Sequence, residues 1–237
     1  MLYRTTILAL AALVAITNTA LPRPAHAAIT LATPPDLSAD VLALALGSVR
    51  CAQGSGLGTR ASRLAVIDYS ISSLEPRLWV FQLDTGELLF RELVAHGRGT
   101  GENFAEHFSN LPGSHQTSLG LFLTDDVYEG GNGYSLRMDG LEPGVNDLAR
   151  ERKIVMHGAP YVDPGVGKVL GRLGRSWGCP AVRREVAHPI IDALAGGQFV
   201  FAYYPDREWL ASSRFLSCGG GDDAPKPILV KLSERTS

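Results

Sequence analysis

Cysteine is scarce in this chain, and so are clusters of basic residues and long apolar runs. Only three of the 237 residues are cysteines, and 22 lysines and arginines stand against 24 aspartates and glutamates. With no run or stripe of basic residues, the sequence does not indicate a nucleic-acid-binding protein. No segment after the first residues approaches the roughly twenty apolar residues that a membrane-spanning helix needs. We therefore expect one globular domain with a sizeable core.

The N-terminus has the pattern of an export signal. Arg4 lies in a short basic region, an apolar run extends from Ile7 to Ile16, and small residues flank His26 in Ala25-His26-Ala27. This is the order of features that a signal peptidase substrate shows, and it predicts cleavage after Ala27. The prediction is a periplasmic or secreted protein with no stable membrane insertion after cleavage. A retained N-terminal anchor is the alternative.

The odd number of cysteines leaves at least one thiol unpaired. In an oxidising compartment cysteines tend to pair, and Cys51 and Cys218 flank the main body of the chain. We predict that these two form a disulfide, while pairings that use Cys179 are the alternatives. Cys179 would then stay a thiol, within the stretch GRSWGCPAV at residues 174–182.

The chain divides into four parts by composition. These are a signal peptide at 1–27, an N-terminal helix and loop at 28–63, a main body at 64–218 and a tail at 219–237. Ser38 is a plausible N-cap of the first helix, and Pro189 suits the first turn of a later one. The body carries short runs rich in β-branched and aromatic residues, separated by turn signals such as DTG at 84–86 and EGGNGY at 129–134. This pattern predicts a mainly β (α+β) fold, a mostly antiparallel sandwich or barrel with a few peripheral helices.

One cysteine and one histidine stand where chemistry could take place. His157 ends the predicted strand KIVMHG, and Cys179 follows some twenty residues later. A thiol becomes a nucleophile when a base takes its proton, and imidazole is well matched to that task near neutral pH. The backbone around Gly178 could also direct N–H groups at a developing oxyanion. A buried, inert cysteine and a structural histidine are the alternative for such an isolated pair.

The combination IVMHG and GRSWGCPAV resembles the active-site signature of the L,D-transpeptidase catalytic domain. In that YkuD-type family a His-Gly precedes a Ser-x-Gly-Cys. The pieces FSNLPGSHQTSLG, GLEPGVNDLARERKIVMHGAPYV and GGQFVFAYYPD are similar to its murein L,D-transpeptidase branch. The resemblance covers about residues 64–210 and implies an L,D-transpeptidase-like β-sandwich.

The resemblance also implies the roles of the residues. Cys179 would be the nucleophile, His157 the base, the Gly158 carbonyl its orienter, and Gly178 part of the oxyanion site, with no metal or organic cofactor. The substrate would be a peptidoglycan stem peptide, with a thioester on the enzyme and a 3→3 crosslink as product. The alternatives are an L,D-carboxypeptidase that trims stem tetrapeptides, and a non-catalytic peptidoglycan-binding or envelope module. The substrate groove would draw on four nearby side chains and one more distant tyrosine: Arg175, Ser176, Trp177, Arg183 and Tyr161.

Two departures from the broader family bear on substrate recognition. Trp177 occupies a position that often holds a second histidine, and Ala181 one that often holds an arginine or asparagine. Arg175 or Arg183 could replace the missing charge, although either could equally form a surface salt bridge. His96, in VAHGRGTG, is the chief rival of His157 as base, and the motif context favours His157.

The segment YVDPGVGKVLGRLG between His157 and Cys179 is predicted to form a lid or groove wall. His107 and His115 do not have the spacing of metal ligands. The sequence does not reveal the acceptor amine or the oligomeric state.

Overall fold

A computed structural model describes residues 31–218, so the predicted signal segment and the tail at 219–237 lie outside the described residues. Eight strands form one continuous sheet in the order β3-β2-β1-β8-β4-β5-β6-β7. Neighbouring strands are antiparallel except for the pairs β1–β8 and β6–β7, which are parallel. The strands are β1 (Arg63–Asp68), β2 (Leu78–Gln82), β3 (Leu88–Glu92), β4 (Gly120–Gly130), β5 (Gly133–Gly140), β6 (Val155–Ala159), β7 (Ala181–Arg183) and β8 (Phe199–Tyr203). The predicted mainly β (α+β) fold is confirmed.

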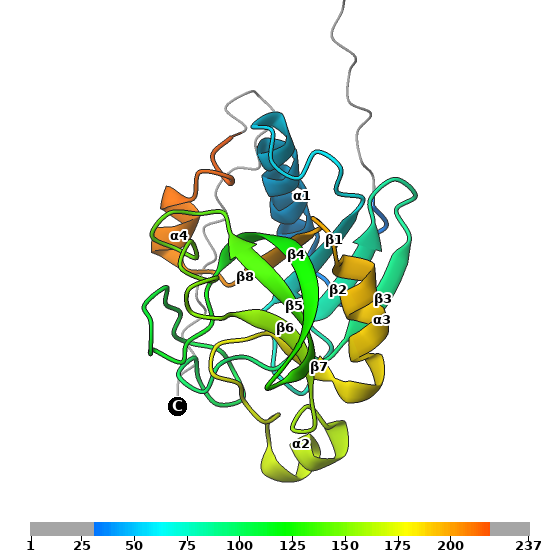
Figure 1. The fold of residues 1–237 in the computed structure, drawn as a ribbon, viewed down its shortest axis with the longest axis vertical. Helices are drawn as coiled ribbons and strands as arrows, with labels where there is room; N and C mark the ends of the chain where they lie inside the picture. Colours follow the sequence, from blue (N-terminus) through cyan, green and yellow to red (C-terminus); the bar gives the residue numbers. More distant parts are fainter. Residues whose placement is uncertain (1–30, 219–237) are drawn as a thin grey trace, which may run out of the picture.

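The core is built on the central strands. β2 and β8 are almost entirely buried, as expected for apolar runs whose two faces are both covered. Four helices surround the sheet: α1 (Ala39–Gly54), α2 (Pro164–Leu170), α3 (Arg184–Leu194) and α4 (Arg207–Ser212). In Figure 1, α2 stands apart from the others at the lower end of the molecule. None of the helices within residues 31–218 is long and apolar enough to cross a membrane.

Local turn chemistry places two hairpins where the sequence predicts them. Asp84–Gly86 joins β2 to β3, and Gly131-Asn132 joins β4 to β5, where Gly130 pairs with Gly133. Gly133 has φ +74°, a conformation that glycine adopts without steric cost. The second hairpin matters for function because its tip borders the candidate active site.

Two predictions about helices need refinement, and one strand was not predicted. Ser38 is the N-cap of α1, but its side chain makes no capping hydrogen bond. α3 begins at Arg184, so Pro189 lies inside the helix rather than in its first turn. β7 escapes prediction because a three-residue strand is too short to show a period of its own.

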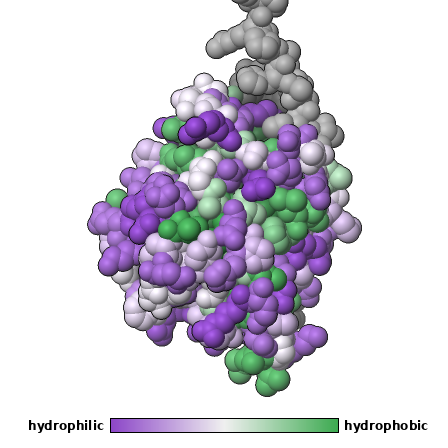
Figure 2. Space-filling view, turned by 45° about the vertical axis from the view of Figure 1, so that its right-hand side comes forward, coloured by the Kyte–Doolittle hydropathy of each residue, from purple (hydrophilic) through white to green (hydrophobic). Residues whose placement is uncertain are grey.

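The segment between His157 and Cys179 contains α2. Asp163 caps it by accepting a hydrogen bond from the Val166 N–H at 2.7 Å, and the helix ends at Gly171 with φ +70°. Three aliphatic side chains of α2 are exposed: Val166, Val169 and Leu170. They account for the hydrophobic group at the lower end of the molecule in Figure 2. α2 therefore projects from the body at the lower end of the molecule, and in the sequence it begins five residues after the end of β6.

The predicted disulfide is present. Cys51 of α1 is bonded to Cys218, across 167 residues of sequence, and Cys179 is a free, buried thiol. The bond connects the first helix of the described chain to its last described residue. All three cysteines are thereby accounted for, and only Cys179 retains a sulfur that can react as a thiolate.

Candidate active site

His157 and Cys179 lie on adjacent chain segments. In the parallel pair β6–β7, His157 is opposite Ala181, and the His157 N–H donates to the Pro180 carbonyl. Two residues before His157 on the same strand, the Val155 N–H donates to Cys179 Sγ at 3.5 Å. The sulfur can in turn donate to the Lys153 carbonyl at 3.7 Å. Strand β6 thus contacts the thiol through its backbone and carries the imidazole.

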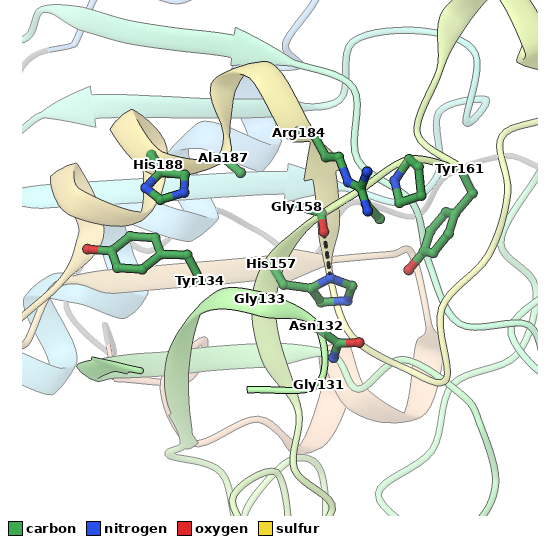
Figure 3. A pocket seen from close by; sticks show the side chains of 12 residues that line it. Gly131, Asn132, Gly133, Tyr134, His157, Gly158, Tyr161, Arg184, Ala187 and His188 are labelled. Atoms are coloured by element: carbon green, nitrogen blue, oxygen red, sulfur yellow. Dashed lines mark hydrogen bonds between the residues drawn. The ribbon is translucent and has the colours of Figure 1, made fainter. Parts of the chain in front are cut away.

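The imidazole of His157 is oriented by its own strand. Its Nδ1 lies 3.1 Å from the Gly158 carbonyl oxygen, and the dashed line in Figure 3 marks this contact. A carbonyl only accepts, so Nδ1 carries the proton and Nε2 is left as the basic nitrogen. Burial lowers the pKa of His157, partly offset by the bond to Gly158. The ring is therefore neutral near pH 7, the form that a general base requires.

Burial also governs the thiol. Cys179 is only 7% exposed, and this desolvation raises the pKa of the thiol. The hydrogen bond from Val155 and the positive charge of Arg152 act in the opposite direction. Cys179 therefore rests as a thiol and needs a base to become a nucleophile.

Two backbone hydrogen bonds hold the loop that precedes Cys179. The Ser176 N–H donates to the His96 carbonyl at 3.0 Å, and the Arg98 N–H donates to the Ser176 carbonyl at 2.8 Å. Gly178 has φ +120°, and a β-carbon there would lie 2.8 Å from the Gln116 carbonyl oxygen and 2.9 Å from a methyl group of Ile154. Only glycine fits this position.

The hydrogen bonds of Ser176 and Gly178 alter the predicted oxyanion site. Ser176 is buried, and its hydroxyl accepts from the Gly178 N–H at 3.1 Å and donates to the Cys179 carbonyl at 2.6 Å. The Gly178 N–H is thus occupied, whereas the Cys179 N–H has no acceptor within residues 31–218. Ser176 shapes the loop from inside rather than facing a groove.

His157 lines an open cavity of about 500 Å³, and Figure 3 shows the side chains around it. It is bordered by the tip of the β4–β5 hairpin, by the end of β6 and by the start of α3. Tyr134 and His188 stack on each other at one edge of it, with ring centroids 4.3 Å apart, and Tyr161 and Arg184 line it too. A cavity with aromatic walls and one cation suits a peptide that carries a carboxylate.

The other predicted groove residues are distributed differently. Arg175 donates to Glu102 at 2.7 Å, and Arg183 forms two hydrogen bonds with Glu92, so both cations are already paired. Trp177 is 69% exposed and stacks on His115 at 5.1 Å. Of the predicted substrate-contacting side chains, Tyr161 borders the cavity.

His96 is unsuited to the role of base. Its Nδ1 accepts from the guanidinium of buried Arg77 at 2.8 Å, and its Nε2 faces the Gly101 carbonyl at 3.3 Å. Burial and the charge of Arg77 lower the pKa of His96 to about 4. With both ring nitrogens engaged, it braces the segment that holds Ser176. No group of three potential metal-binding side chains occurs in the part of the chain that the structure describes.

Two arginines near the site were not predicted from the sequence. Arg184 directly follows Arg183 yet lines the cavity, and Arg152, five residues before His157, lies close to the loop of Cys179. Both arginines lie within or beside the stretches that resemble the family, and this nearness to the motifs is the one signal that could have identified them. The sequence does not show which groups the two arginines contact or whether their charges are paired.

The chain is similar to known proteins only at low sequence identity. No curated protein matches the chain, and solved structures match only distantly. An L,D-transpeptidase from Mycobacterium smegmatis is 16% identical, with 61% of this chain and 59% of that chain covered and a TM-score of 0.38. The helical cell shape determining protein Pgp2 from Campylobacter jejuni is 14% identical, with 59% and 46% covered and a TM-score of 0.40.

An L,D-transpeptidase from Mycobacterium tuberculosis H37Rv is 17% identical, with 60% and 58% covered and a TM-score of 0.34. The chain therefore spans less than two thirds of the length of these solved proteins. The family assignment rests instead on the family model described as L,D-transpeptidase catalytic domain, which matches residues 33–203. The match includes both His157 and Cys179 and most of the sheet. The chain belongs to the L,D-transpeptidase catalytic domain family.

Proposed function

We propose that this protein is an exported cysteine L,D-transpeptidase that forms 3→3 crosslinks between peptidoglycan stem peptides. The observation that carries the proposal is the unpaired thiol of Cys179 on the segment adjacent to His157, whose Nδ1 is occupied and whose Nε2 is left basic. Family membership supplies the substrate class. The export pattern at residues 1–27 supports action in the periplasm or outside the cell.

The reaction proceeds in two acyl transfers. His157 Nε2 takes the proton of Cys179, and Sγ attacks the carbonyl carbon of the diaminopimelate residue. The C–S bond forms, the proton passes from His157 to the leaving nitrogen, and the C–N bond to D-alanine breaks. An amine of a second stem then attacks the thioester, transfers its proton to His157 and displaces the sulfur. The energy of the broken amide is conserved in the new one, so no external energy source is needed.

The surrounding residues divide the supporting tasks. The unpartnered Cys179 N–H is better placed than the occupied Gly178 N–H to meet the oxyanion. Arg184 faces the cavity, whereas Arg175 and Arg183 are bound to acidic side chains, so Arg184 is the better partner for a substrate carboxylate. Tyr161 and exposed Trp177 offer surfaces against which a stem peptide can pack.

Incubation with a purified tetrapeptide muropeptide, followed by mass spectrometry, tests the proposal. A crosslinked dimer that has lost one D-alanine is expected. A tripeptide monomer alone would mean that water resolves the thioester and that the protein is an L,D-carboxypeptidase. Unchanged substrate would refute both enzymatic functions.

Replacing His157 with glutamine should lower kcat by about 10²–10⁴-fold, the usual contribution of a positioned general base. Because burial lowers the pKa of His157, the wild-type rate should stay constant as the pH falls to 6.5 and decline only below it. The rate of dimer formation between pH 4 and pH 9 measures both effects. His107→Gln, at an exposed position, is the control and should behave as wild type. A wild-type rate in His157→Gln would remove this residue from the mechanism.

A further inference from the structure

We propose that Arg152 is a positioning residue of this same site, which clamps the segment at 116–118 against Gly178 and supplies a permanent positive charge near the sulfur of Cys179. The inference rests on the proposed nucleophilic role of Cys179. It identifies the group that makes the thiolate attainable in a buried setting.

The guanidinium of Arg152 is bound only by neutral groups. Nη1 donates to the Ser109 carbonyl and to the Ser118 hydroxyl, each at 2.6 Å. Nη2 donates to the Gln116 carbonyl at 2.5 Å and to the Ser114 hydroxyl at 3.2 Å. No acidic side chain among residues 31–218 forms an ion pair with it. The charge of Arg152 is therefore not neutralised by a carboxylate.

The same hydrogen bonds connect Arg152 to the loop of the nucleophile. A β-carbon added at Gly178 would lie 2.8 Å from the Gln116 carbonyl oxygen and 3.4 Å from Nη2 of Arg152. The adjacent Thr117 hydroxyl donates to the Gly178 carbonyl at 3.1 Å. Arg152 thus holds the segment at 116–118 in place, and Gly178, the residue before Cys179, packs against this segment.

The electrostatic effect of this placement is mutual. Burial raises the pKa of the Cys179 thiol, and the charge of Arg152 acts against that shift. Burial lowers the pKa of Arg152, and the thiolate acts against that shift in turn. His157 cannot take over this role completely, because its own pKa is lowered by burial and its positive form is unfavourable. A guanidinium stays charged at every pH at which the enzyme works. Arg152 therefore favours the thiolate both before and after His157 takes the proton.

A purely structural clamp would explain the hydrogen bonds but not an effect of charge, and two substitutions separate these roles. Arg152→Gln removes the charge, whereas Arg152→Lys keeps the charge and loses the planar fork of donors. The readout is the thiol pKa of Cys179, obtained from the rate of iodoacetamide alkylation at each pH by mass spectrometry. No other thiol interferes, because Cys51 and Cys218 are bonded to each other.

We expect Arg152→Gln to raise the thiol pKa by about one unit, a tenfold smaller thiolate fraction at neutral pH. Arg152→Lys should keep a thiol pKa close to wild type while its melting temperature falls as far as that of the glutamine variant. Arg150→Gln is the matched control: it lies two residues away but pairs with Asp125 and Asp139 at the surface, so the thiol pKa should not change. Equal thiol pKa values in wild type, Arg152→Gln and Arg152→Lys would overturn the inference.

A second measurement needs no variant and covers the case in which Arg152→Gln does not fold. A positive charge near Sγ should favour the anionic reagent iodoacetate over neutral iodoacetamide, relative to the same ratio for N-acetylcysteine, at low ionic strength. A ratio equal to or below that of N-acetylcysteine would overturn the inference. Neither assay uses a muropeptide. The proposed function can therefore fail while the inference about Arg152 stands, and the reverse also holds.

Discussion

Replacing Cys179 with alanine should abolish the formation of crosslinked dimer, because the variant has no atom that can hold the acyl group. The other two cysteine sulfurs are joined in the Cys51–Cys218 disulfide and cannot substitute. Loss of a nucleophile that works as a unit with its base commonly removes nearly all of the catalytic rate, by factors on the order of 10⁶. Mass spectrometry of the muropeptide products after long incubation measures the residual activity. It should also show no covalent adduct on the variant protein.

The control must separate lost chemistry from lost structure. Cys179 is buried against Val155 and Lys153, so alanine leaves a small gap, and a modest fall in melting temperature is expected. Cys179→Ser preserves the shape more closely and should be inactive as well, because a hydroxyl is far harder to deprotonate than a thiol. Dimer formation by a folded Cys179→Ala protein would refute the proposed mechanism altogether.

Of the substitutions proposed for this protein, removal of the Cys51–Cys218 disulfide should lower the free energy of unfolding the most. The bond closes a loop of 167 residues, and the chain-entropy treatment of such a loop gives about 5 kcal/mol of stabilisation. The double variant Cys51→Ser and Cys218→Ser should therefore have a free energy of unfolding lower by about that amount, measured by urea denaturation. Since natural domains are stable by only about 5–15 kcal/mol, the variant would be close to unfolding.

Wild-type protein unfolded in the presence of dithiothreitol should reproduce the stability of the double variant, because both lack the same crosslink. Cys179→Ser provides the matched control, since it removes a sulfur that forms no disulfide. Its unfolding should still depend on reductant. If reductant left the urea midpoint of the wild type unchanged, the crosslink would not contribute to stability.

Much of the fold was predictable because its signals are local. Tight turns at 84–86 and 131–132 specify two hairpins, and buried apolar runs specify β1, β2 and β8. The start of α3 and the existence of β7 were not predictable. β7 is only three residues long, and its pairing with β6 across a long connection supplies what its sequence lacks.

The candidate site also has features that the sequence predicts and features that depend on tertiary contacts. A thiol and an imidazole in a recognisable motif are properties of the chain, and the Gly158 carbonyl follows His157 directly. The choice between His157 and His96 as base depends on Arg77, a buried side chain nineteen residues from His96 that occupies its Nδ1. That contact exists only after the strands have assembled.

By itself, the sequence determined the candidate thiol and imidazole, the predicted disulfide partners, the family resemblance and most of the strands, because these depend on residue identity and short-range pattern. The tertiary structure decided which charges are free. Arg183 and Arg175 are matched to Glu92 and Glu102, 91 and 73 residues away, while Arg152 and Arg184 form no ion pair within residues 31–218. The tertiary structure also decided which backbone N–H groups are free. The Ser176 hydroxyl accepts from the Gly178 N–H, whereas the Cys179 N–H has no acceptor within residues 31–218. Whether a charge or an N–H is available to a substrate depends on what the folded chain places against it, and no local pattern encodes that.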